Sequence, residues 1–273
     1  MKKRIVTTTS VFEPGYPAEK AIERLAGLGF EALDMALDYW VYQPDSPFLG
    51  EGYLEWAELM REKAKKFGVP YVQAHSAGDV LNEEGLFARS LETAGVLGVT
   101  YMVVHPVWKY SDGTIIEDDK DFISLNANII RQWIEKAQQC GVILLSENLL
   151  WGSSIDPRVI AALVKEVDSE WFGWCYDTGH ANCFGYSPCV LQECVVPPIS
   201  LHIQDNYGKK DDHLIPGEGT IDWDILVKEV KAVGYTGDLV LEAHHQSLEA
   251  VDEERDEILK RLLKSAKMLQ KSW

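Results

Sequence analysis

Long apolar runs are missing from this sequence. No stretch approaches the roughly 20 apolar residues that a membrane-spanning helix requires. The first residues, MKKRIVTTTSVFEPGYP, are basic, but the apolar stretch before Glu13 and Pro14 is shorter than that of a secretory signal peptide. We therefore expect a soluble, cytoplasmic protein that has no membrane partner.

Positive charge is scarce as well. The chain has 26 lysines and arginines against 43 aspartates and glutamates, which gives a formal net charge of −17. Proteins that bind nucleic acid neutralise its phosphates with Lys and Arg, so this balance argues against a nucleic-acid partner. A small neutral or weakly charged ligand fits the acidic chain better.

Paired cysteines and a dinucleotide motif are also lacking. The five cysteines form no C-x-x-C pair, and they lie at positions 140, 175, 183, 189 and 194. An odd set without pairing predicts reduced thiols that serve mostly as small apolar side chains. No G-x-G-x-x-G follows the first predicted strand, so nothing indicates a dinucleotide site.

What the sequence does contain is a repeated unit: a glycine, a β-rich run, and a polar residue at its end. The units end at Asp34, His75, His105, Glu147, Asp177 and Glu242, and two further strands are expected at RIVTTTS and at ISLHIQD around His202. The segments between the runs carry helical periodicity, as in residues 53–67. Eight alternating strands and helices without a linker predict one α/β domain over residues 1–273, a (β/α)8 TIM barrel. An open doubly wound sheet is the alternative.

Titratable residues gather at the predicted strand ends. In such a barrel, function lies at the C-terminal ends of the strands, where this chain has His75, His105, Glu147, Asp177, His202 and Glu242. Glu147 continues the inward row of Ile143 and Leu145, and a half-buried carboxylate without a partner is costly. Singly, each residue also fits a helix cap or a structural role. Together they indicate one divalent cation, either Mn, Co, Mg or Zn.

Five motifs carry a resemblance to a known family. They are SENLLWG at 146–152, CYDTGH at 175–180, LHIQD at 201–205, DDHLIPGEGTIDW at 211–223 and LVLEAH at 239–244. In this order and spacing they resemble the xylose isomerase-like barrel superfamily, over nearly the whole chain. That group contains sugar isomerases, ketose 3-epimerases, hydroxypyruvate isomerase, inosose dehydratase and endonuclease IV.

The resemblance implies a set of site residues. The metal ligands are expected to be Glu147, Asp177, His202 and Glu242. The histidines expected to contact the substrate are His75, His105, His180 and His213. Apart from the resemblance, Trp108 and Trp151 are candidate substrate contacts, and Lys209 or Lys210 could meet a charged group of the substrate. The two tryptophans fit the apolar face of a sugar, although a place at the rim or in a subunit contact explains them equally well.

The implied chemistry is proton transfer next to a carbonyl. A metal on the carbonyl and hydroxyl oxygens stabilises an enediolate as it forms, and Glu147 and Glu242 remove and return the proton from opposite sides. The expected function is therefore a metal-dependent isomerase or epimerase of a sugar or sugar phosphate. A homo-oligomer fits barrels of this type.

Other functions stay open on the same residues. A dehydratase would use the same metal and the same acid–base pair. A trinuclear zinc phosphodiesterase similar to endonuclease IV would use His75, His105, His180, Asp211 and His213 as further ligands. A barrel that only binds a sugar is a third alternative, and it would leave the two glutamates without a task.

Four further features complete the expectations. Cys175 should point into the barrel one layer below the site, and Cys183 should follow in a loop or at a helix start. The segment 108–121 reads as a surface loop or as a loop that covers the site. His244 and His245 are expected to be exposed.

Overall fold

The computed structural model describes residues 2–41, 43, 45–77 and 83–273. Its eight parallel strands are β1 (Ile5–Thr8), β2 (Ala32–Ala36), β3 (Tyr71–His75), β4 (Tyr101–Val104), β5 (Ile143–Glu147), β6 (Phe172–Asp177), β7 (Ser200–His202) and β8 (Leu239–Leu241). They pair in the order β7-β6-β5-β4-β3-β2-β1-β8. A parallel bridge between Ile203 and Leu241 joins the two edges, so the predicted (β/α)8 barrel is confirmed.

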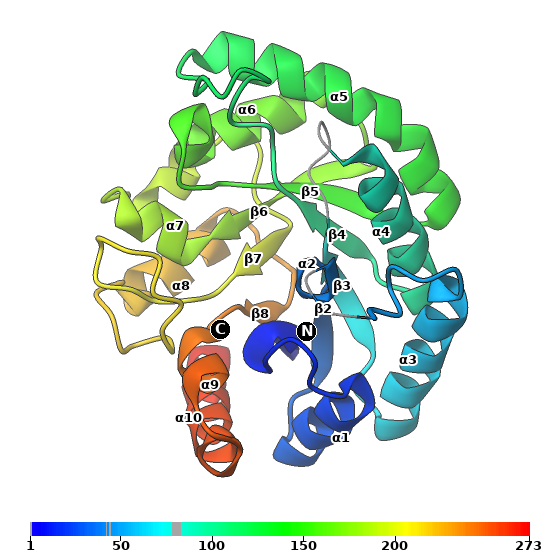
Figure 1. Cartoon of the computed structure of the whole chain (residues 1–273). Coiled ribbons are helices and arrows are strands. Elements are labelled where there is room, and N and C mark those ends of the chain that lie inside the picture. The colour runs from blue at the N-terminus through cyan, green and yellow to red at the C-terminus, as the bar shows by residue number, and fades with distance from the viewer. Residues whose placement is uncertain (1, 42, 44, 78–82) are drawn as a thin grey trace.

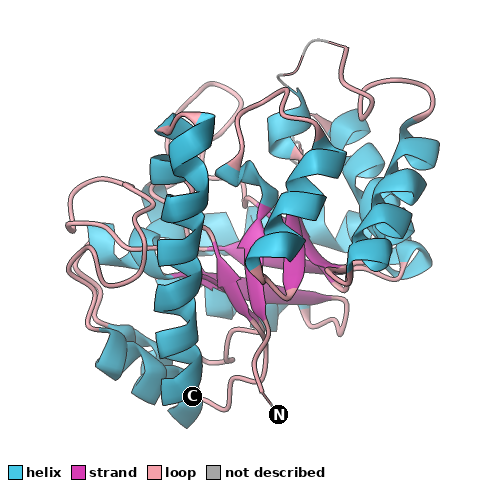
Figure 2. Cartoon of the chain, turned by 90° about the horizontal axis from the view of Figure 1, so that it is seen from below, coloured by secondary structure: helices cyan, strands magenta, loops and turns pink. Residues whose placement is uncertain are grey.

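Helices surround the strands on all sides (Figure 1, Figure 2). The α-helices are α1 (Ala18–Leu28), α2 (Asp38–Val41), α3 (Tyr53–Phe67), α4 (Glu84–Leu97), α5 (Asp119–Cys140), α6 (Pro157–Val167), α7 (Thr178–Cys183), α8 (Trp223–Ala232), α9 (His245–Glu249) and α10 (Asp252–Ser272). Short 3-10 turns are η1 (Thr9–Val11), η2 (Gly152–Ile155) and η3 (Pro188–Glu193). Among the described residues, no helix is both long enough and apolar enough to cross a bilayer.

Glycine ends several of the helices as the repeat predicts. Gly68 follows α3 with φ 74°, and its amide donates to the last turn of the helix. Gly173 is different, because it lies inside β6 rather than after a helix. A Cβ there would sit 2.5 Å from Ile199 Cδ1, so close packing against this side chain favours glycine. Asp168, with φ 51°, takes the left-handed position after α6.

The barrel interior is filled below the C-terminal ends of the strands. Val103, Leu145 and Cys175 pack as one buried cluster inside the barrel, and Val6, Ala32 and Val240 form another. Cys175 is fully buried in this layer, as predicted, and Cys183 ends α7. The side chains of the next inward layer are therefore presented to the mouth of the barrel on a rigid base.

Strand β2 continues beyond its predicted end at Asp34, to Ala36. The pairing of β2 with β3 shifts between Leu33 and Asp34, because Tyr71 faces Leu33 while Gln73 faces Asp34. Val72 is thus the extra residue of a bulge. The consequence is that Asp34 lies within the barrel wall, one layer below the strand ends.

Candidate metal and active site

Four side chains from consecutive strands meet at the mouth of the barrel. Each of Glu147, Asp177, His202 and Glu242 offers one ligand atom, and these atoms lie within 4.8 Å of one another. Nδ1 of His202 lies 2.7 Å from Glu147 Oε1 and 3.4 Å from Glu242 Oε2. The sequence predicted this group of four, and the structure brings all four together.

Strand register explains the convergence. Glu147 pairs with Cys175 across β5 and β6, and Asp177 pairs with His202 across β6 and β7. Each ligand continues an inward row, because side chains two positions apart on a strand face the same side. Glu242 follows β8 directly, and its amide donates to the carbonyl of Ile203 at 3.0 Å.

The buried carboxylates of this group favour the binding of a cation. Burial opposes ionisation of Glu147, but His202 and the hydrogen bonds from neighbouring imidazoles hold the pKa of the carboxyl well below its usual value. Burial, reinforced by the charges of Glu147 and Asp177, raises the pKa of Glu242 well above its usual value. Among the described residues, Asp177 Oδ2 is buried without a hydrogen-bond partner. Carboxylates and an imidazole that crowd together in this way fit a divalent ion.

A second cluster flanks the first. Asp211 Oδ2 lies 3.2 Å from Nε2 of His180 and 2.8 Å from Nε2 of His213. Each ring donates its Nδ1–H to a backbone carbonyl at 2.8 Å, His180 to Asn148 and His213 to Glu242. Burial acts to lower the pKa of His180, but Asp177 and Asp211 outweigh burial and raise this pKa to about 10.

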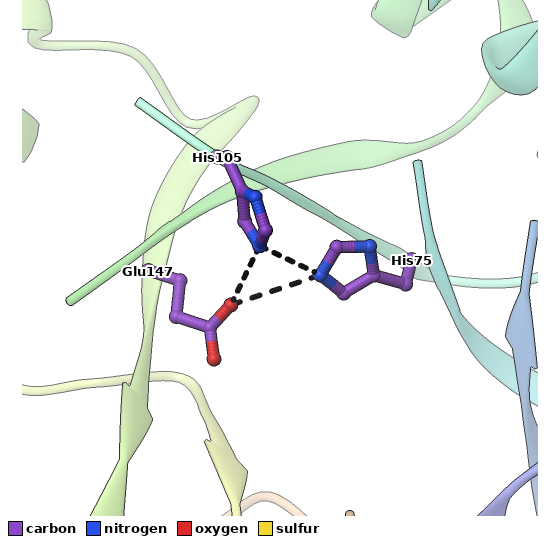
Figure 3. Close-up of side chains that lie close together, drawn as sticks. All are labelled: His75, His105 and Glu147. Atoms are coloured by element: carbon purple, nitrogen blue, oxygen red, sulfur yellow. Dashed lines mark hydrogen bonds and ion pairs between the residues drawn. The ribbon is translucent and has the colours of Figure 1, made fainter. Parts of the chain in front are cut away.

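A third cluster shares Glu147 with the first. Figure 3 shows His75, His105 and Glu147 pointing toward one another. The two Nε2 atoms are 3.1 Å apart, and they lie 3.8 and 3.6 Å from Glu147 Oε2. Burial acts to lower the pKa of His75, but Glu147 outweighs burial and raises this pKa to about 9. For His105 burial dominates and lowers the pKa.

In the flanking clusters, the orientation of three imidazoles suits metal binding. His75, His180 and His213 each face a carbonyl oxygen through Nδ1 and a titratable side chain through Nε2. A histidine that ligates a metal commonly donates its other ring N–H to such a carbonyl. The residues present therefore fit one ion in the four-residue group, and the flanking clusters have the donors for further ions.

Gln204 links the first two clusters. Its amide nitrogen lies 2.6 Å from Asp211 Oδ1 and 3.3 Å from Asp177 Oδ1. Gly179, in the CYDTGH motif, permits this approach, since a Cβ there would sit 2.1 Å from the Gln204 amide. The buried glutamine was not among the residues that the sequence singled out, although it lies two positions after His202.

The loop between β7 and α8 is organised by Asp205. This fully buried carboxylate accepts hydrogen bonds from the amides of Asn206, Gly217 and Ile221 and from the Trp223 indole. The distances lie between 2.9 and 3.2 Å. Asp205 therefore fixes the loop that carries Asp211 and His213.

An open pocket with a volume of about 200 Å³ lies above the ligands. Its lining residues are Asp38, Tyr39, His75, His105, Glu147, Leu149, Leu150, Trp151, His180, Asp211, His213, Glu242 and His244. Trp151 is 41% exposed, and Trp108 stacks on it with ring centroids 4.8 Å apart. Trp108 thus supports Trp151 and does not line the pocket. Lys209 is exposed and also lies outside the lining, so the structure does not bring it into this pocket.

The loop after β4 is attached to the pocket wall. The amide of Ser153 donates to the carbonyl of Ile116 at 2.9 Å, and a Cβ at Gly152 would sit 2.4 Å from the same oxygen. The amide of Ile116 donates to Trp108. This part of the segment 108–121 is therefore packed against the 151–155 turn beside the site.

His244 differs from its expected position. It is half-buried, it lines the pocket, and its ring lies 4.2 Å from that of His213. Its Nδ1–H donates to the carbonyl of Glu242 at 2.9 Å, because the chain turns sharply after β8. His245 is exposed, as predicted.

Comparisons with known proteins agree with this architecture. An uncharacterized protein of Sinorhizobium fredii, y4fM, is 29% identical over 161 residues, which cover 55% of this chain and 49% of that protein. The chain thus matches about half the length of this relative. The crystal structure of D-psicose 3-epimerase in the presence of D-fructose has a TM-score of 0.75 at 16% identity, over 98% of this chain and 99% of that one. IOLI protein, crystallised with a binding zinc atom, has a TM-score of 0.72 at 16% identity, over 97% and 96%.

These structural likenesses show the fold, and sugar epimerases are among the neighbours. The family assignment comes from a family model described as xylose isomerase-like TIM barrel, which matches residues 22–269. The chain belongs to the xylose isomerase-like TIM barrel family.

Proposed function

We propose that this chain is a divalent-metal-dependent isomerase or epimerase of a sugar or sugar phosphate. The observation that carries the proposal is the position of Glu147 and Glu242, which both approach Nδ1 of His202 and both line one pocket. Two carboxylates at one pocket provide a base and an acid for a single substrate. Sugar epimerases among the structural neighbours support this choice of reaction class.

The ion would be held by Glu147, Asp177, His202 and Glu242. When bound, it supplies a positive charge that polarises the substrate carbonyl and stabilises the enediolate. One glutamate removes the proton from the carbon next to the carbonyl, and the other returns a proton. The carbon that is reprotonated decides between 1,2-isomerisation and epimerisation.

The remaining pocket residues orient the substrate. His180 and His213 are fixed through Nδ1 and direct their Nε2 atoms to Asp211, and this cluster lines the pocket, where it binds the hydroxyl groups of the substrate. His75 and His105 have the same role on the opposite flank. Trp151, supported by Trp108, packs against the apolar face of the sugar.

The experiment is isotope exchange in D2O with a panel of ketoses and ketose phosphates. Deuterium appears next to the carbonyl whenever a glutamate exchanges the abstracted proton with solvent, even where net conversion is small. NMR detects the exchange, and product analysis separates isomerisation, epimerisation and dehydration. No exchange and no conversion across the panel, from protein loaded with Mn, Co, Mg or Zn in turn, would contradict the proposal.

A second candidate is a trinuclear phosphodiesterase, and one observation favours it. The two flanking clusters supply complete ligand groups beside the first, and one of them shares Glu147. The net charge of −17 opposes a nucleic-acid substrate. Metal content per chain and nicking of an abasic duplex distinguish the two candidates.

A further inference from the structure

We propose that Gln73 is a positioning residue for the metal site, and that its side-chain amide turns over when His202 takes up a metal. The inference rests on the metal-dependence of the proposed function, but it does not depend on the substrate. Gln73 is 1% exposed and lies in the barrel wall, one layer below the ligands. Gln73 does not line the pocket above the ligands. Among the described residues, its side chain forms hydrogen bonds with His202 and Ser200.

Gln73 contacts the side of the His202 ring that faces away from the glutamates. Its amide nitrogen lies 3.0 Å from Nε2 of His202, while Nδ1 of the same ring faces Glu147 and Glu242. The amide oxygen of Gln73 accepts a hydrogen bond from the hydroxyl of Ser200 at 2.5 Å. His202 is fully buried, so these contacts decide which ring nitrogen carries the proton.

The orientation of the Gln73 amide fits the tautomer of His202 that has no metal on Nδ1. An amide nitrogen only donates, so Nε2 of His202 accepts and the ring proton lies on Nδ1, from which it is donated to Glu147. In this state Nδ1 has no lone pair for a metal. When a metal takes Nδ1, the proton lies on Nε2 and requires an acceptor.

A half-turn of the Gln73 amide provides that acceptor. The turn exchanges the oxygen and the nitrogen, so the oxygen accepts from Nε2–H and the nitrogen donates to Ser200. A hydroxyl both donates and accepts, which lets Ser200 partner either orientation. The same three buried groups therefore give Nε2 of His202 a partner in both tautomers.

Asp34 lies on the same side of the ring. Its Oδ2 lies 4.0 Å from Nε2 of His202, and both carboxyl oxygens are buried without a hydrogen-bond partner among the described residues. A proton on Nε2 places a partial positive charge on the side that faces this carboxyl. Burial raises the pKa of Asp34, so this carboxyl favours the tautomer that binds metal when it is ionised.

The test measures zinc affinity and the tautomer of His202, with no substrate present. Zinc affinity is measured by competition with a chelator, and NMR of protein labelled with 15N-histidine reports which ring nitrogen carries the proton. The His202 signals are assigned by their loss in His202→Gln. We expect the proton on Nδ1 without metal and on Nε2 with zinc.

Gln73→Met keeps the size of the side chain and removes the amide. We expect it to weaken zinc binding about 10- to 100-fold, the usual effect of losing a partner of a metal-ligating histidine. Gln73→Glu keeps an acceptor for Nε2–H, and we expect its zinc affinity to stay close to that of the unmodified protein. The control is Val240→Ala, which removes apolar packing from the barrel interior and no hydrogen-bonding side chain.

Equal zinc affinities in Gln73→Met and the unmodified protein would overturn the inference, and so would a proton that stays on Nδ1 after loading. If Gln73→Met, Gln73→Glu and Val240→Ala all weaken binding equally, Gln73 is only a packing residue, and the inference fails. If the unmodified protein binds no divalent metal, both the proposed function and this inference fail. If it binds metal but the Gln73 variants behave as described above, only this inference fails.

Discussion

His202 and Glu147 lie 55 positions apart in the chain, yet Nδ1 of the imidazole is 2.7 Å from Oε1 of the carboxylate. Both residues end strands, β7 and β5, and both are almost fully buried. Glu147 also lies against the side chains of the third cluster, and it belongs to three of the four candidate ligand groups among the described residues. Substitution of Glu147 is therefore the most severe change that the site offers.

Glu147→Gln and Glu242→Gln are each expected to abolish deuterium exchange, because an amide cannot carry the proton. General acid–base catalysis contributes about 10²- to 10⁴-fold, and the loss should reach at least that range. Proton exchange on the best substrate of the panel is the measurement. Glu253→Gln, on the exposed face of α10, is the matched control. Full activity in both active-site variants would contradict the mechanism.

Asp211→Asn tests how many ions the protein holds. With a single ion in the four-residue group, the variant keeps the metal content of the unmodified protein, and its KM rises because His180 and His213 lose their common acceptor. Metal content by elemental analysis and KM on the best substrate are the readouts. A loss of metal from the variant would instead place an ion in the second cluster.

Removal of metal should make stability depend on pH in a defined direction. The pKa of His75 is raised to about 9 and that of His180 to about 10, above the 6.5 of an unfolded histidine. The folded state thus binds more protons, so their contribution is complete below pH 6.5 and is lost as pH rises through 9 to 10. Thermal unfolding in the presence of a chelator should show a falling Tm over this window.

The opposite trend is expected for metal affinity over the same window. A cation in the four-residue group is repelled by protonated His75 and His180, so it binds more tightly as these rings lose their protons. His180→Gln should flatten the fall in Tm by removing one of the two titrating groups. A Tm of the metal-free protein that rises between pH 6.5 and 9 would contradict the expected fall in stability and the expected effect of His180→Gln.

Trp151→Ala should raise KM by about threefold to tenfold, the range of one aromatic contact of about 0.5–1.5 kcal/mol. Zinc affinity should not change, because Trp151 is not among the candidate ligands. Steady-state kinetics and chelator competition provide the two readouts. A fall in kcat with KM unchanged would show that Trp151 does not contact the substrate in the ground state.

Asp205→Ala should reduce the free energy of unfolding by about 3 kcal/mol, because it leaves buried donors without an acceptor. Urea denaturation measures the loss. Asp222→Ala, which removes only the cap at the start of α8, should cost about 1 kcal/mol. Equal losses in the two variants would contradict the central role of Asp205 in the loop.

The sequence predicts this fold well because each repeat carries its own local signals. Glu147 and Asp177 could be placed inside the barrel from alternation along β5 and β6, and the structure confirms both positions. Gln73 was within reach of the same rule, since it lies two positions before His75. An amide neither titrates nor matches a metal-ligand pattern, so the sequence gives no signal of a role for Gln73 at the site.

Other features depend on contacts that local signals do not encode. The bulge at Val72 arises where β3 pairs with β2, and it determines that Gln73 faces Asp34. The burial of His244 depends on His213, which comes from a loop 31 positions earlier in the chain. Neither arrangement follows from the periodicity of one segment.

The hydrogen bonds of Asp205 have a consequence for the entropy of binding. Because protein groups alone hold the loop between β7 and α8, its conformational entropy is lost during folding and not when a ligand arrives. Asp211 and His213 are therefore preorganised before any ion or substrate is bound. A larger share of the contact energy is then available for affinity.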